Sequence, residues 1–228
     1  MRLRALKKSS RLLVWLVALQ SMSVATPYLL WFRPSPRITD GWFWTVQGRF
    51  SPVLALFWVW VVVIPLAGSG AHWSAELNDA FFMEAWRHPT YRAWLWRSVG
   101  STLLVGAVSV AVGLGPLLLA FHSGQVIEVA LSVALLTAYC ACLTTMTVLA
   151  TVLGAKSAHA FAGVLLFHVT NLALEGAGVP SVLRFFLAGE AGGWVSALVA
   201  IIAMGTVIAA LLLVSSPATI MTRGSEFE

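Results

Sequence analysis

Long apolar runs, separated by short polar segments, constrain the fold of this chain more than any motif in it does. A helix needs about 20 mostly apolar residues to cross a hydrocarbon core of about 30 Å. Only helices and closed barrels satisfy their backbone hydrogen bonds in lipid, and these runs lack the polar–apolar alternation of barrel strands. The sequence therefore predicts an all-α integral membrane protein with six transmembrane helices, at residues 12–32, 52–68, 98–121, 126–153, 158–174 and 194–214.

The composition leads to the same class of protein. The chain is 59% hydrophobic and 10% charged, which excludes an ordinary soluble globule, where about a quarter of residues are charged. Several tryptophans lie at the ends of runs, and we expect these, including Trp73 and Trp94, in the membrane interface. Trp15, Trp58 and Trp60 lie within runs, and we expect them to pack inside the bundle.

Most of the 14 Lys and Arg residues fall in segments that would lie on one side of the membrane. Cytoplasmic loops carry an excess of Lys and Arg, so we expect a multi-pass protein of a bacterial inner membrane with both termini in the cytoplasm. The net charge of +5 then favours anionic lipid over nucleic acid as the partner. The basic lead at 2–11 has no signal-peptide cleavage pattern, so the first run is expected to be retained. We expect one membrane domain over residues 1–223, while GSEFE at 224–228 resembles a tag-linker remnant.

The segment from His72 to Arg97 is neither apolar enough to cross a membrane nor short enough to be a simple turn. It predicts a helix that Ser74 caps and Pro89 ends, because the residue before a proline avoids the helical conformation. Its apolar face would lie against the inner membrane surface and leave a polar face free for a partner. A surface helix with no partner stays open as the alternative. The apolar face holds Leu77, Phe81, Phe82, Ala85 and Trp86, and the polar face holds Glu76, Asp79, Met83 and Arg87.

A second polar set, formed by His168, Asn171 and Glu175, recurs at i, i+3 and i+7 near the outer end of the fifth run. Isolated polar groups are costly in lipid, so this face must meet protein or water. It predicts either hydrogen bonds between helices or the lining of an outer gate. Phe185 and Phe186 follow in a stretch too short to span, which predicts a re-entrant or interfacial hairpin that would form part of such a gate.

Motifs for catalysis and phosphate binding do not occur in the sequence. We find no G-x-S-x-G, no H-E-x-x-H and no phosphate loop, so the chain is not expected to be an enzyme or to hold a cofactor. Cys140 and Cys142 point roughly 200° apart around a helix, which predicts neither a disulfide nor a shared metal. A copper site formed by Cys142, Met146 and His168 is the alternative.

The loop after the second run and the layout of the chain resemble the permeases of the ABC type-2 superfamily, the type V exporters. Glu76 matches the acid of their signature, and Pro89 and Arg92 match its end at nearly the family's spacing. The layout matches in the basic start, the six spans and the broken outer segment between spans five and six. The glycine that follows the acid in that family is missing here, and Arg97 stands near its usual lysine.

This resemblance implies a half-transporter that pairs with a second permease subunit, identical or related, and docks on cytoplasmic ABC ATPase subunits that bind ATP and Mg. It also implies an apolar or amphipathic substrate, such as a peptide, a drug or a lipid-like molecule, and no nucleic-acid partner. Two alternatives stay open: a six-helix substrate-capture subunit of an uptake transporter, and a non-transporting assembly or sensor protein. The ATPase-coupling residues that the resemblance implies are Glu76, Asp79, Met83, Arg87, Pro89 and Arg92.

Overall fold

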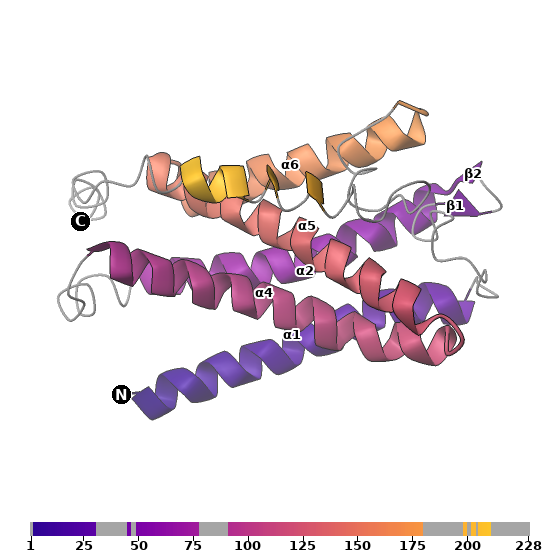
Figure 1. The fold of residues 1–228 in the computed structure, drawn as a ribbon, viewed down its shortest axis with the longest axis horizontal. Coiled ribbons are helices and arrows are strands. Elements are labelled where there is room, and N and C mark those ends of the chain that lie inside the picture. The colour runs from indigo at the N-terminus through magenta and orange to yellow at the C-terminus, as the bar shows by residue number, and fades with distance from the viewer. Residues whose placement is uncertain are drawn as a thin grey trace.

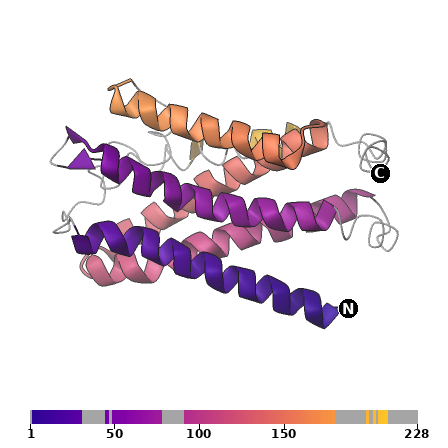
Figure 2. The same cartoon turned by 180° about the vertical axis from the view of Figure 1, so that it is seen from behind.

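Long helices lie side by side in this protein, each antiparallel to the next along the chain (Figures 1 and 2). The computed structural model describes residues 2–30, 45–46, 49–77, 91–179, 198–199, 202–203 and 205–210. The helices are α1 (Arg2–Leu30), α2 (Pro52–Ala75), α4 (Tyr91–Phe121), α5 (Val126–Leu153) and α6 (Ser157–Gly176). A two-residue antiparallel pair, β1 (Thr45–Val46) with β2 (Arg49–Phe50), precedes α2, so the described chain is otherwise helical.

Four of these helices are long and apolar enough to cross a membrane, namely α2, α4, α5 and α6. The first helix has a shorter apolar stretch, Arg11–Thr26, within its described part. The prediction of a helical chain with helices of membrane-spanning length and hydropathy is therefore confirmed for the described residues. The sixth span predicted at 194–214 is described only in short helical pieces, and it stays a prediction.

Some helix ends differ from the predicted span ends. The fourth run, 126–153, coincides with α5, but the second run does not end at Gly68, because α2 continues to Ala75. Ser74 therefore lies inside α2 and caps no new helix, so that part of the prediction was wrong. Hydropathy marks the depth of a helix in lipid, whereas the helix itself continues as long as backbone hydrogen bonds do.

Polar side chains on α1 connect that helix to both α2 and α4. Gln20 Nε2 donates to the Val61 carbonyl of α2 at 2.7 Å, and Ser21 Oγ donates to the Gly113 carbonyl of α4 at 2.9 Å. Gly113 lets the two backbones approach, because a Cβ there would lie 2.7 Å from Gln20 Cβ. These contacts fix the rotation of α1 in a bundle whose remaining contacts are mostly apolar.

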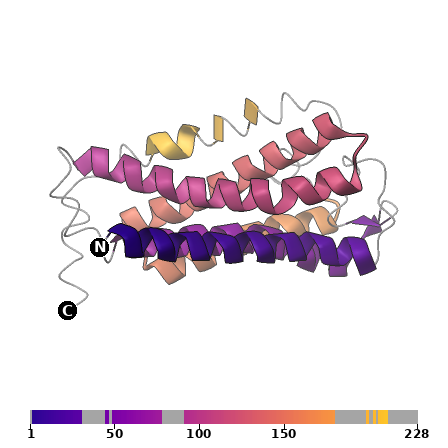
Figure 3. The same ribbon diagram turned by 90° about the horizontal axis from the view of Figure 1, so that it is seen from below.

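One end of the bundle is basic. The N-terminal end of α1 and the start of α4 lie together there (Figures 1 and 3), and the turn between α5 and α6 lies at the same end. Arg11, Arg97 and Lys156 are exposed in this region. This end brings together the segments that the sequence predicts to be cytoplasmic.

Replacing Gly113 with leucine is expected to destabilise the bundle by about 1–3 kcal/mol, because the added side chain overlaps Gln20 and the Val17 carbonyl. Thermal unfolding of the purified protein in detergent measures the effect. Gly115→Leu on the same helix is the matched control, since nothing lies within 4 Å of a Cβ built there. Equal destabilisation by the two substitutions would contradict the close α1–α4 approach.

Candidate functional site

The ends of α2 and α4 are joined by a ring of polar contacts among His72, Glu76, Ser98 and Ser101, which we call the α2–α4 clasp. Ser98 Oγ donates to Glu76 Oε2 at 3.2 Å, and Ser101 Oγ donates to the Ser98 carbonyl at 2.9 Å. His72 Nε2 lies 3.0 Å from Ser101 Oγ and 3.9 Å from Glu76 Oε1. The ring therefore closes within two helices and holds their ends in one geometry.

The direction of the hydrogen bonds in the clasp follows from the number of hydrogens available. The Ser101 hydroxyl has one hydrogen, which it donates to the Ser98 carbonyl, so His72 Nε2 must carry the hydrogen in its bond to Ser101. Glu76 and His72 side chains are 27% and 18% exposed, so water only partly screens their contacts. Hydrogen bonds to charged groups contribute about 1.5–3 kcal/mol, and the Ser98–Glu76 bond is of this kind.

Helical spacing explains how the sequence builds the clasp. His72 and Glu76 are four residues apart on α2, and Ser98 and Ser101 are three apart on α4, so each pair shares one helix face. The chain continues after α2 through a π-helical turn at Glu76–Leu77. Such turns often occur at functional sites, and here the turn carries the residue that reaches across to α4.

Of the predicted coupling residues, the structure brings Glu76 into the clasp and places Arg92 in the first turn of α4. The described contacts of Glu76 are with its own bundle, so its contact with an ATPase stays a prediction. Sequence reasoning missed Ser98 and Ser101, although their spacing beside the polar segment was a usable signal. The other coupling residues, Asp79, Met83, Arg87 and Pro89, lie outside the described residues, as do Phe185 and Phe186 of the predicted gate.

Two tryptophans form an apolar layer beside the clasp. Trp73 Nε1 donates to Thr151 Oγ1 on α5 at 2.8 Å, and the Trp73 and Trp94 rings lie 6.4 Å apart. Both side chains are 1% exposed, so the two rings face neighbouring helices, and their place in the membrane interface stays a prediction. Trp58 is buried as predicted, but Trp15 and Trp60 are exposed instead of packed inside. Trp73 can be buried because its indole N–H finds an acceptor on a neighbouring helix.

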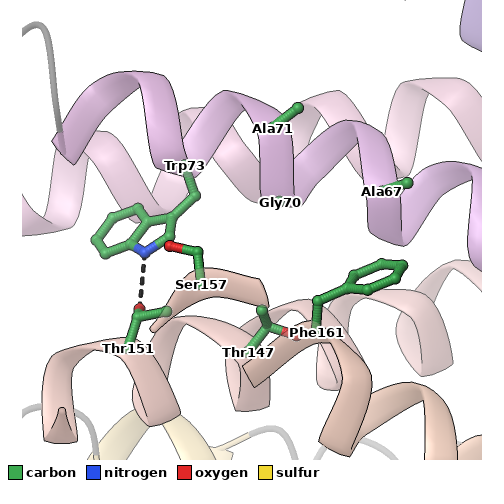
Figure 4. A pocket seen from close by; sticks show the side chains of 8 residues that line it. All are labelled: Ala67, Gly70, Ala71, Trp73, Thr147, Thr151, Ser157 and Phe161. Carbon is green, nitrogen blue, oxygen red and sulfur yellow. Dashed lines mark hydrogen bonds between the residues drawn. The ribbon is translucent and has the colours of Figure 1, made fainter. Parts of the chain in front are cut away.

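A cavity of about 250 Å³ opens next to Trp73, between α2, α5 and α6 (Figure 4). We call it the α2–α5–α6 cavity. Small residues of α2 form one wall, and the ends of α5 and α6 form the other. It is lined by Ala67, Gly70, Ala71, Trp73, Thr147, Thr151, Ser157 and Phe161.

The predicted polar set on α6 is partly inside the bundle. His168 Nδ1 lies 2.8 Å from the Tyr139 hydroxyl of α5, and the two rings lie 5.6 Å apart. Its Nε2 is buried without a hydrogen-bond partner among the described residues. Asn171 is also buried and donates to the Phe167 carbonyl of its own helix, while Glu175 is partly exposed. His168 thus makes the interhelical hydrogen bond that was one of the two predicted alternatives, and the gate stays a prediction.

The cysteines are free and buried in α5. Among the described residues, no group of three or more His, Cys, Asp or Glu side chains is arranged to hold a metal ion. The copper alternative includes a methionine, Met146, beside Cys142 and His168, and it stays a prediction.

Comparison of the chain with protein-family models, with curated proteins and with solved structures gave no match.

A double-mutant cycle tests whether Tyr139 and His168 stabilise the contact between α5 and α6. Tyr139→Phe leaves His168 Nδ1 buried without its partner, so we expect a loss of about 1–3 kcal/mol in the free energy of unfolding. The double variant Tyr139→Phe/His168→Phe removes both partners. Its loss in the free energy of unfolding should be smaller, by about 0.5–3 kcal/mol, than the sum of the losses in the two single variants. Unfolding in detergent measures all four proteins, and strictly additive losses would show that the pair does not interact.

Proposed function

We propose that this chain is the transmembrane permease subunit of an ATP-driven ABC exporter of the type-2 group. The observation that carries the proposal is the α2–α4 clasp. It ties together the two helices that flank residues 78–90, where the sequence resembles the family's coupling helix. A segment attached at both of its ends to one fixed helix pair is suited to receive mechanical work from a partner.

Through the clasp, a movement of residues 78–90 can reach the membrane-spanning helices. Residues 78–90 connect the π-helical turn after α2 with the first turn of α4. Because the clasp holds α2 and α4 together, a displacement of the segment moves both helices as one unit. In turn, α2 contacts α1, α5 and α6, so the displacement reaches the rest of the bundle through packed side chains.

The energy source in this proposal is a separate protein. The sequence has no phosphate loop, so ATP and Mg bind to cytoplasmic ABC ATPase subunits that dock beneath the basic end of the bundle. A second permease subunit, identical or related, completes the transporter. The basic end faces the cytoplasm of a bacterial inner membrane, because positively charged segments are retained on that side.

The proposed substrate is apolar or amphipathic, and it leaves the cell through a route walled by apolar side chains. The buried polar groups near the middle of the bundle, Tyr139 and His168, already contact each other. A route for a strongly charged substrate would need charged groups in the spans, and the described spans bury hydroxyl, amide and imidazole groups instead.

Co-purification of the affinity-tagged chain from its host membrane tests the partnership. We expect an ABC ATPase to be retained with the wild-type protein and lost with Glu76→Lys, because the substitution reverses a charge at the base of the coupling segment. Glu175→Lys reverses a charge at the opposite end of the bundle and should retain the ATPase. A wild-type chain that retains no ATPase, and instead binds a small soluble ligand with nanomolar affinity, would be a capture subunit and would overturn the proposal.

The substitution Ser98→Ala tests whether the clasp transmits movement to the helices without affecting how the ATPase docks. Ser98 is 2% exposed and cannot contact a partner, so the ATPase should stay bound. Loss of the hydrogen bond to Glu76 should weaken coupling by about 1.5 kcal/mol, which corresponds to a roughly tenfold fall in ATP-driven export in proteoliposomes. Thr102→Ser, which keeps a hydroxyl that can donate to the Ser98 carbonyl, is the control. Unchanged export by Ser98→Ala would show that the clasp does not transmit the movement.

A further inference from the structure

We propose that the α2–α5–α6 cavity binds one acyl chain of an anionic membrane phospholipid as a resident ligand. This inference is independent of the exporter proposal, because it rests on the shape and chemistry of the cavity and on the exposed Lys156 that precedes Ser157.

The cavity is held open by its own walls. Trp73 is fixed at one edge by the 2.8 Å bond to Thr151 and by its contact with Trp94, so its ring cannot swing into the space (Figure 4). Phe161 of α6 lines the cavity as well and packs against the main core. Between these bulky residues α2 presents only small side chains. The space therefore persists because closing it would break the contacts of Trp73.

The chemistry of the walls favours hydrocarbon over water. Thr147 donates to the Leu143 carbonyl at 3.0 Å, and Thr151 donates to the Val148 carbonyl at 2.7 Å. Thr151 also accepts from Trp73, so both hydroxyl hydrogens and one acceptor site of these threonines are used within the protein. A buried water needs two to four polar partners, roughly three on average. An empty cavity is destabilising in proportion to its volume, so an apolar occupant is the favourable state.

The size and position of the cavity indicate which apolar molecule fills it. Its volume of about 250 Å³ lies below the 300–1,000 Å³ or so typical of pockets for whole drug-sized ligands, so it takes a slim chain. The lining has no charged side chain, but the Ser157 hydroxyl lies at its edge beside Trp73 (Figure 4). The preceding residue, Lys156, is exposed at the basic end of the bundle.

These features match the successive parts of an anionic phospholipid. An acyl chain in the cavity places its ester group near the Ser157 hydroxyl and its phosphate near the Lys156 ammonium. Basic groups at the cytoplasmic ends of membrane helices attract anionic head groups in the same way.

Photocrosslinking tests the site in the full chain, reconstituted in phosphatidylcholine vesicles with a phosphatidylglycerol probe that carries a diazirine in its acyl chain. We expect crosslinks to concentrate on peptides containing Trp73 and Phe161. Gly70→Leu fills the cavity without a clash, because nothing lies within 4 Å of a Cβ at Gly70, and crosslinking there should fall roughly tenfold. Gly163→Leu on α6 has equally open surroundings and should leave crosslinking unchanged.

Two further variants keep the test decisive. Ala71→Leu fills the same space from the next position of α2, so it replaces Gly70→Leu if that protein does not fold. Lys156→Gln should lower crosslinking by the phosphatidylglycerol probe and not by a phosphatidylcholine probe with the same chain. Crosslinks spread evenly over the apolar faces of the bundle, or insensitive to both filling variants, would overturn the proposal. Equal crosslinking by the two probes would contradict the proposed preference for an anionic head group.

Discussion

Polar groups inside a hydrocarbon layer must find their partners within the protein, and this requirement determines how the helices of this bundle are paired. Several Thr hydroxyls meet it by donating to a carbonyl of their own helix, as Thr102, Thr145 and Thr147 do. Such bonds do not restrain a neighbouring helix. The helix pairs are instead held by bonds that cross between them. In the described part of the chain these include Gln20 to Val61, Ser21 to Gly113, Trp73 to Thr151, Tyr139 to His168 and the α2–α4 clasp.

The sequence predicted a helix boundary correctly wherever the same residues interrupt both the hydrophobic run and the helix. The turn after Phe121 and the turn after Leu153 interrupt both the apolar pattern and the backbone bonds, so α5 was predicted to the residue. At the end of α2 the two differ, because polar residues there continue the helix. Composition located Glu76 and His168 as important polar residues. It did not show their partners, because Ser98 and Tyr139 become neighbours only through helix packing.

The clasp and the α2–α5–α6 cavity lie on two sides of the same few residues of α2. His72 contacts α4, and the adjacent Trp73 contacts α5 and borders the cavity. Movement of the clasp therefore rotates or shifts Trp73, and a change in the cavity acts on the clasp through the same short stretch of backbone. The last turns of α2 thus join the basic end of the bundle to the α2–α5–α6 cavity.

The turn between α4 and α5 has a consequence for how the protein is made. Residues 122–125 join two long helices, and the Gln125 amide donates to the His122 carbonyl at 2.9 Å across this turn. So short a connection gives α5 no freedom to leave the vicinity of α4 during synthesis. We therefore expect the threonine-rich helix α5 to enter the bilayer as one half of a hairpin with α4.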